Sequence, residues 1–385
     1  MQDRANHRFV VTRHDFSMLL ATLRERGYLL LGPTLRDQAI VYDEINGAED
    51  LPAGWTDEQE AGQYKVKRRD DNALFAYNVG PHSWKKFLQL PSLTLWKAQK
   101  TDNGFKVEER DEATPRMAFI GVRPCELRAI AVQDQVLTGG DHIDPDYARR
   151  RKHAFIVTVQ CTQAGNTCFC VSMGTGPRAE EGFDLAVTEI IDTHRHEFVI
   201  EAGTDTGAEI LARVPHRSAS EADWQNAQSA TQRTAEQMGR QIETSGIREL
   251  LYRNAEHPRW DEVADRCLAC TNCTMVCPTC FCTAVEDVTD LAGQTAERIQ
   301  RWDSCFNSRY SYIHGGIVRP STRSRYRQWL THKLAYWHDQ FGSSGCVGCG
   351  RCISWCPAGI DITEEVAAIR ANDGGGMEQG RKTNE

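Results

Sequence analysis

The sequence predicts a mixed α/β or α+β segment over residues 1–250, a mainly helical segment over residues 251–372 and a mobile tail over residues 373–385. Two observations place a boundary near residue 250. Before it, short apolar runs typical of strands alternate with helical periodicity. After it stand 11 of the 15 cysteines, eight of them in two dense runs, and no strand pattern is obvious between those runs.

The composition is that of an ordinary globular protein. At 385 residues the chain is long enough for two domains, and its 40% hydrophobic and 25% charged residues give no sign of general disorder. A formal net charge of -8 argues against nucleic acid as the main partner. No stretch approaches the ~18 apolar residues of a membrane span, and Met1–Val11 lacks the apolar core of a secretory signal. We therefore expect a cytoplasmic protein without a membrane span.

Apolar periodicity and turn residues predict the first elements. They are a helix over 15–26, strands over 28–31 and 38–42 joined by a turn at 32–34, and a loop over 47–72.

Two apolar runs that end at cysteines predict an α/β layer. Met117–Val122 is followed by Arg123, Pro124 and Cys125 and then by a helical pattern, and Ala154–Val159 ends near Cys161. Strands that alternate with helices in this way present side chains at the strand ends. The sequence does not determine the order of the strands.

The remaining elements lead from the α/β layer to the cysteine runs. Residues 189–200 are strand candidates, residues 215–245 have the composition of a helical linker, and a helix begins near Trp260. The Trp- and Tyr-rich stretches between the runs then indicate a helical domain.

The two runs share one ligand pattern, C-x2-C-x2-C-x3-C-P, which is typical of bacterial iron–sulfur proteins. The first run is Cys267, Cys270, Cys273 and Cys277, and the second is Cys346, Cys349, Cys352 and Cys356. In two-cluster ferredoxins the fourth cysteine of each run binds the other cluster. We therefore expect an α-helical ferredoxin-like domain with two 4Fe-4S clusters. The first is bound by Cys267, Cys270, Cys273 and Cys356, and the second by Cys346, Cys349, Cys352 and Cys277.

Zinc sites and disulfides are the alternatives for these eight cysteines. Zinc takes four ligands, usually as two separated pairs, and does not require a triplet followed by Cys-Pro. Disulfides do not fit the reducing cytoplasm.

Four further cysteines, Cys125, Cys161, Cys168 and Cys170, stand in the N-terminal segment. Four is the number of ligands that another cluster needs, and nearby glycines supply flexible backbone. The irregular spacing is equally compatible with buried structural thiols.

The last three cysteines, Cys280, Cys282 and Cys305, are interpreted as buried structural thiols. A catalytic thiol would need a base, and the sequence does not place His314, the nearest downstream histidine, beside any of them.

Residues 304–338 contain six basic residues and no Asp or Glu. Interleaved aromatic residues raise the alternative of an RNA-binding surface, which the acidic remainder of the chain opposes. A solvated helix face is another reading. Cations beside negatively charged clusters, or a surface for an acidic partner, are further ones.

The chain has no recognisable catalytic motif. Rossmann, Walker, H-E-x-x-H and G-x-S-x-G patterns are all lacking from the sequence.

Several segments taken together resemble the iron–sulfur β subunits of cytoplasmic sulfhydrogenases, which are NAD(P)-linked nickel–iron hydrogenases. The segments that carry this resemblance are 121–126, 168–177, 257–260 with the run that follows, 311–316 and 319–327. The A subunit of anaerobic sulfite reductase is a related protein. The similarity covers residues 115–370, with Glu126 where the family has Asp.

The resemblance implies an electron-transfer subunit without its own active site. Such a subunit carries electrons between a flavoprotein that binds FAD and NAD(P) and the large and small subunits of a nickel–iron hydrogenase. It also favours a third cluster on Cys125, Cys161, Cys168 and Cys170. An electron-transfer subunit of an anaerobic sulfite or sulfur reductase is the alternative, and an RNA-binding module is a further one.

Overall fold

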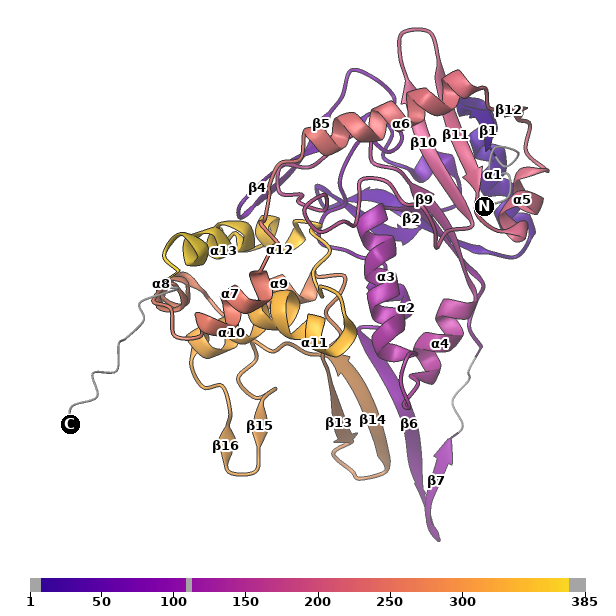
Figure 1. Ribbon diagram of the computed structural model, residues 1–385. Helices are drawn as coiled ribbons and strands as arrows, with labels where there is room; N and C mark the ends of the chain where they lie inside the picture. Colours follow the sequence, from indigo (N-terminus) through magenta and orange to yellow (C-terminus); the bar gives the residue numbers. More distant parts are fainter. Residues whose placement is uncertain (1–7, 109–112, 374–385) are drawn as a thin grey trace.

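The computed structural model describes residues 8–108 and 113–373. Figure 1 shows a sheet-rich N-terminal region, a cluster of short helices formed by the C-terminal part of the chain, and two strand arms that project from that cluster. The predicted α/β character of the N-terminal region is confirmed. The predicted tail from residue 374 onward lies outside the described residues.

An eight-stranded mixed sheet forms the framework of the N-terminal region. Its order is β12-β1-β11-β10-β9-β8-β2-β3, in which β10, β9, β8 and β2 run parallel to one another and the outer strands pair antiparallel. The strands are β1 (Arg8–Thr12), β2 (Leu29–Arg36), β3 (Ala39–Glu44), β8 (Met117–Val122), β9 (Ala154–Val159), β10 (Leu185–Ile191), β11 (His196–Ala202) and β12 (Arg217–Ser218).

The central strands are apolar because both of their faces are covered, as is usual for parallel strands. All six residues of β8 are buried, and five of the six in β9. The covering helices are α1 (Arg13–Glu25), α3 (Pro124–Leu137), α4 (Pro145–Lys152), α5 (Asp205–Leu211) and α6 (Glu221–Glu236). The predicted first helix and the strands that precede Cys125 and Cys161 are thus confirmed.

Two of the predicted loops and turns are wrong. Gly32, Pro33 and Thr34 lie within β2, and the chain turns instead at Asp37 and Gln38, both at positive φ. Residues 47–72 are not a loop throughout. They contain η2 (Ala48–Asp50) and an antiparallel hairpin of β4 (Trp55–Glu60) and β5 (Gln63–Arg68). The hairpin is polar on much of its surface, so it lacks the apolar alternation that identifies a strand.

The expectation of no strands between the two cysteine runs is also wrong. The strands β13 (Thr283–Thr289) and β14 (Thr295–Trp302) extend a sheet with β6 (Ser92–Thr101) and β7 (Gly104–Glu108), in the order β13-β14-β6-β7. A second small arm consists of β15 (Tyr312–Ile313) and β16 (Gly316–Ile317). Most residues of these arms are at least partly exposed, so no buried face imposes apolar alternation on the sequence.

Short helices pack around the two cysteine runs. They are α2 (Lys85–Leu88), α7 (Ile247–Arg253), α8 (Arg259–Arg266), α9 (Asn272–Met275), α10 (Thr322–Thr331), η3 (His332–Tyr336), α11 (Trp337–Phe341), α12 (Arg351–Ser354) and α13 (Ile362–Ala371). A core that includes Trp260, Trp329, Leu330 and Ile353 is continuous with the partly buried cysteines of both runs.

The segment 215–245 contains α6 as predicted, together with the short strand β12. The division near residue 250 remains a prediction, because β6 and β7 of the first segment share a sheet with β13 and β14 of the second. No helix among residues 8–108 and 113–373 combines the length and apolar character of a membrane-spanning helix.

Candidate metal centre

The two cysteine runs fold into the same local structure. In the first run Ala269 and Thr271 have positive φ, and the short helix α9 follows. In the second run Gly348 and Gly350 occupy the equivalent positions, again at positive φ, and α12 follows. Each run therefore curls around a point on one side of its backbone, as the spacing requires of a chain that surrounds a cubane.

The fourth cysteine of the second run lies with the first run. Burial raises the pKa of Cys267, and the charges of Cys356 and Cys270 raise it further. Burial likewise raises the pKa of Cys273 well above its usual value, with further contributions from Cys305, Cys267, Cys356 and Cys270. Charges affect one another this strongly only at short range. Cys267, Cys270, Cys273 and Cys356 are hereafter the first set.

The reciprocal exchange forms the second set, which is Cys346, Cys349, Cys352 and Cys277. Burial raises the pKa of Cys352 well above its usual value, and Cys346, Cys349 and Cys277 add to the increase. Cys277 also raises the pKa of Cys346, for which burial is the main cause. The fourth cysteine of each run thus lies close to cysteines of the other run, and Cys273 also acts on Cys352. The division into two crossed ligand sets remains a prediction.

The four N-terminal cysteines form a third set around one small cavity. Cys125 stands in the first turn of α3, beyond the end of β8, and Cys161 stands beyond the end of the neighbouring strand β9. Cys168 and Cys170 lie on the loop that follows, and all four thiols line the cavity together with Cys349 of the second set.

Close backbone packing joins the third set to the second run. Phe169 N donates a hydrogen bond to Gly348 O at 2.8 Å. A Cβ atom on Gly348 would lie 2.7 Å from the Cα of Cys170, and one on Gly350 would lie 2.4 Å from Thr167 O. Only glycine allows this approach while keeping a positive φ.

A buried ion pair lies between the second and third sets. Arg351 Nη2 donates to Glu126 Oε1 at 2.7 Å, and the two side chains are 6% and 1% exposed. Tyr42 OH also donates to the Glu126 carboxylate. Burial opposes the charge of Arg351, but Glu126, Cys349 and Cys125 raise its pKa well above its usual value. The acid at position 126 therefore holds an arginine against two cysteine sets, a role that the sequence did not reveal.

Two buried lysines face the second set. Lys333 Nζ donates to Cys277 Sγ at 3.2 Å and to Thr279 Oγ1 at 3.1 Å. Burial opposes its charge, but Cys277, Cys280 and Cys346 raise the pKa of Lys333 well above its usual value. Lys85 Nζ lies 3.9 Å from the centre of the Trp302 ring, and burial lowers its pKa although Cys280 and Cys277 act in the opposite direction.

The three remaining cysteines are not deeply buried. Cys280, Cys282 and Cys305 are partly exposed, which departs from the expected burial. The Cys280 thiol is hydrogen-bonded to Cys277, and this contact and then burial raise the pKa of Cys280 well above its usual value. Cys305 raises the pKa of Cys273 in the first set. Cys280 therefore borders the second set, and Cys305 borders the first.

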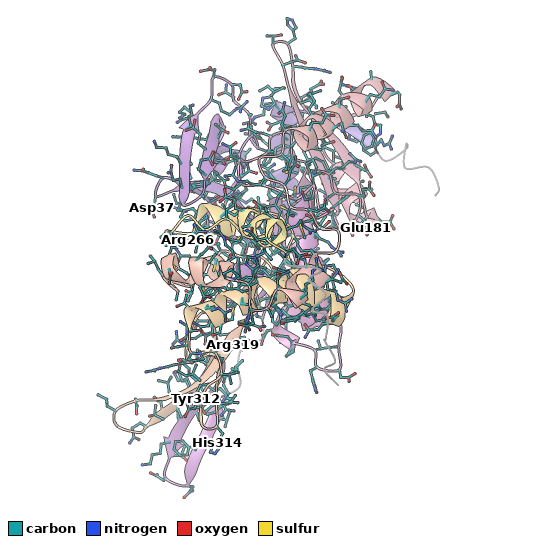
Figure 2. All side chains as sticks on the ribbon, turned by 60° about the vertical axis from the view of Figure 1, so that its left-hand side comes forward. Asp37, Glu181, Arg266, Tyr312, His314 and Arg319 are labelled. Carbon is teal, nitrogen blue, oxygen red and sulfur yellow. The ribbon has the colours of Figure 1, made fainter. Side chains whose placement is uncertain are left out.

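His314, the histidine considered as a base for these thiols, lies on a projecting arm of the molecule (Figure 2). Figure 2 shows Tyr312 and His314 on the projecting arm, with Arg319 nearer to the body of the molecule. His314 is exposed in the turn between β15 and β16.

The basic residues of 304–338 do not form one free surface. Arg323 and Arg327 pair with Glu256, Arg323 also pairs with Asp261, and Arg325 and Lys333 are buried. Of the interpretations of this basic segment, Lys333 supports the one in which cations lie beside the cysteine sets.

The residues of the sets fit iron–sulfur clusters. A hydrogen bond from the Cys280 thiol, and then the charge of Lys333, lower the pKa of Cys277 well below its usual value. Burial raises the pKa of five other grouped thiols, which are Cys267, Cys273, Cys346, Cys349 and Cys352. The buried ammonium of Lys333 has no carboxylate partner among the described residues. Iron bound by thiolates keeps the thiols ionised, and a cluster with four thiolates is a negative group beside which a buried ammonium is stabilised.

The cysteines of the three sets are not arranged as ligands of a single metal ion. In the described parts of the chain, no three His, Cys, Asp or Glu side chains converge as ligands of one ion. In a cubane each thiolate binds a different iron, so the four thiols need not converge on one point.

A cleft of ≈ 820 Å³ leads to the second set. It lies between α3, the loop after Cys170 and the segment 343–347, and Cys346 is among its lining residues. Arg128, Arg151 and Arg178 also line it, together with acidic residues that include Glu181, which Figure 2 labels.

Comparisons with known proteins agree with this site. Residues 266–360 match the family profile described as "4Fe-4S dicluster domain". The chain is 32% identical over 289 residues to "Sulfhydrogenase 2 subunit beta" of Pyrococcus furiosus, an alignment that covers 74% of this chain and 82% of the relative. No solved structure matches the chain at a significant level.

Proposed function

Because the chain belongs to the family of sulfhydrogenase β subunits, we propose that it is the electron-transfer subunit of a hydrogenase complex. In this proposal it carries electrons between a flavoprotein subunit that binds FAD and NAD(P) and the large and small subunits of a nickel–iron hydrogenase. The chain itself contributes no hydrogen-converting or hydride-transferring site.

The proposal assigns one 4Fe-4S cluster to each cysteine set. The first set and the second set hold the two clusters of a ferredoxin-like domain, and Cys125, Cys161, Cys168 and Cys170 hold a third. The observation that carries the assignment is the exchange of Cys277 and Cys356 between the two runs. Such crossed ligation is the arrangement of two-cluster ferredoxins.

Each group of residues has a defined task in this function. The thiolates bind iron, while the clusters, when bound, supply one-electron acceptors and donors. Lys333, Arg351 and Arg123 place positive charge at the cysteine sets, and the surrounding apolar core limits access of water. Burial, charge and hydrogen bonds to sulfur are the factors that determine cluster potentials.

The close packing of the second and third sets supports a continuous path. Cys349 of the second set lines the cavity of the third, and Cys273 of the first set raises the pKa of Cys352 in the second. The cleft that leads to Cys346 offers one place where a partner could approach this path. The arrangement therefore suits a relay with three neighbouring centres.

The experiment is identification by mass spectrometry of the proteins that co-purify, without oxygen, with the native chain. Nickel–iron hydrogenase subunits together with a flavoprotein are the expected result. A siroheme subunit would instead assign the chain to a sulfite reductase and overturn the hydrogenase proposal.

A functional test follows on the same complex. Hydrogen-driven reduction of NAD(P) should be lost when the complex is rebuilt with iron-free chain. Activity that survives without the iron of this chain would contradict the relay.

A further inference from the structure

Lys333 is fixed to both parts of the second set. It lies in the π-helix η3 (His332–Tyr336), a wider helical form that is frequent at functional sites. Its backbone carbonyl accepts hydrogen bonds from Gly345 N at 2.8 Å and from Ser344 Oγ at 3.1 Å, just before Cys346. Its side chain reaches Cys277 at 3.2 Å. The ammonium is thereby held in place relative to cysteines of both runs.

Thr279 fixes the orientation of the ammonium. Its hydroxyl oxygen lies 3.1 Å from Lys333 Nζ and 3.2 Å from Cys277 Sγ, and the same hydroxyl donates to Gly345 O at 2.7 Å. Since the acceptors around Nζ are this neutral hydroxyl and a cysteine sulfur, the described residues provide no carboxylate to neutralise the positive charge. The charge is therefore directed at the second set.

Two buried arginines near the cysteine sets are arranged differently. Arg351 also contacts Cys349, but Glu126 pairs with it at 2.7 Å and cancels much of its field. At the first set, Arg325 acts on Cys267 through space, and its guanidinium donates to the carbonyls of Arg319 and Pro320 at 3.1 and 2.7 Å. Among residues 8–108 and 113–373, the second set thus has a cation that contacts a ligand thiol and pairs with no acid. At the first set, no such contact with a ligand thiol is seen in the same residues.

We propose that Lys333 raises the reduction potential of the cluster on the second set above that of the cluster on the first set. Reduction adds one negative charge to a cluster, and a nearby positive charge stabilises the reduced state more than the oxidised state. The electron that enters the C-terminal domain first then resides on the second set, beside the cleft at Cys346. This inference rests on the proposed function, because it requires clusters on both sets.

The test is a potentiometric titration of the anaerobically purified full chain, monitored by electron paramagnetic resonance. Lys333→Met removes the charge and keeps the length of the side chain, and Lys333→Gln is a second neutral variant that retains a hydrogen-bond donor. The signal that disappears in Cys270→Ala identifies the first cluster. The other C-terminal signal, which disappears in Cys346→Ala, identifies the second.

Lys86→Met is the matched control. Lys86 follows Lys85 in the short helix α2 (Lys85–Leu88). Its Nζ donates a hydrogen bond to Tyr42 O at 3.0 Å and not to a cysteine. Removing its charge should leave both signals unchanged.

In both Lys333 variants the ratio of reduced to oxidised second cluster should fall about tenfold at a fixed potential, which corresponds to about 59 mV for a one-electron couple. The first cluster should titrate as in the native chain. An unchanged potential, an equal shift in Lys86→Met or a shift of the first cluster instead would overturn the inference. Loss of the second cluster's iron in both variants would also overturn it, because Lys333 would then hold the cluster rather than tune it.

Iron analysis of the unmodified chain separates this inference from the proposed function. Native protein without iron on the two sets would refute the relay itself. Iron on both sets with unshifted potentials would refute only the role of Lys333.

Discussion

The two cysteine runs have the same spacing but different surroundings. Leu268 in the first run is 68% exposed, whereas its counterpart Val347 in the second is 3% exposed. Cys270 is exposed and Cys349 is not. The second run is enclosed because the loop with Cys168 and Cys170 packs on its backbone, while the first run faces solvent on that side. One ligand pattern can therefore support two centres of different accessibility and charge.

The residues between the cysteines reflect this difference. The positive-φ positions are Ala269 and Thr271 in the first run and glycines in the second, where a Cβ atom would meet another backbone. At the next position, Asn272 in the first run binds Trp355 O at 3.2 Å near the surface. Its counterpart Arg351 is buried and ion-paired.

The largest expected effect concerns the crossing of the runs. Cys356→Ala should remove the cluster of the first set, although Cys356 belongs to the second run, because its thiol lies with Cys267 and Cys273. Cys277→Ala should remove the cluster of the second set. Iron content and electron paramagnetic resonance of each variant measure the loss. If Cys356→Ala removes only the cluster that depends on Cys346, the runs are not crossed.

The next effect concerns the ion pair that only the second run has. Arg351→Met leaves Glu126 buried without its arginine, which should destabilise the protein by about 3–5 kcal/mol. Asn272→Ala at the equivalent position of the first run removes one surface hydrogen bond and should cost about 1 kcal/mol or less.

Urea-induced release of iron, followed for both variants, measures these two costs. A cost for Arg351→Met no larger than that for Asn272→Ala would show that the burial of the second run has no energetic role.

The glycines offer a third test. Gly350→Ala forces a non-glycine residue into positive φ, which costs about 1–2 kcal/mol, and brings Cβ to 2.4 Å from Thr167 O. The reverse change in the first run is Thr271→Gly, which should alter the free energy of unfolding by about 1 kcal/mol at most. Glycine removes the strain of a positive φ in the folded chain, but it also raises the conformational entropy of the unfolded chain, and the two effects oppose each other. Thermal melting of the two variants under anaerobic conditions gives the comparison. Equal melting temperatures would mean that close packing of the loop with Cys168 and Cys170 does not require glycine at position 350.

The smallest effect is kinetic. Because Cys270 is exposed, a chelator should remove iron from the first set several-fold faster than from the second. Samples frozen at intervals after the chelator is added, and measured by electron paramagnetic resonance, give the rate at which each cluster signal is lost. Faster loss from the second set would contradict the difference in accessibility.

The sequence alone determined the ligand chemistry. The spacing of the two runs predicts which cysteines surround each cubane and that Cys277 and Cys356 exchange partners, because a chain that curls around a cubane allows few other spacings. Apolar runs also predicted β8, β9 and the helix after Cys125, since buried parallel strands need continuous apolar sequence. The family resemblance predicted the third set, whose irregular spacing left it ambiguous when considered alone.

The tertiary structure decided what surrounds those ligands. Nothing in the local sequence places Lys333 on Cys277 or Arg351 on Glu126, because their partners are 56 and 225 residues away along the chain. The arms of β13 and β14 have no buried face to mark them in the sequence. Ligand spacing is a property of a few consecutive residues. Burial and electric field depend on segments that meet only when the chain folds, and these determine the potential of each centre.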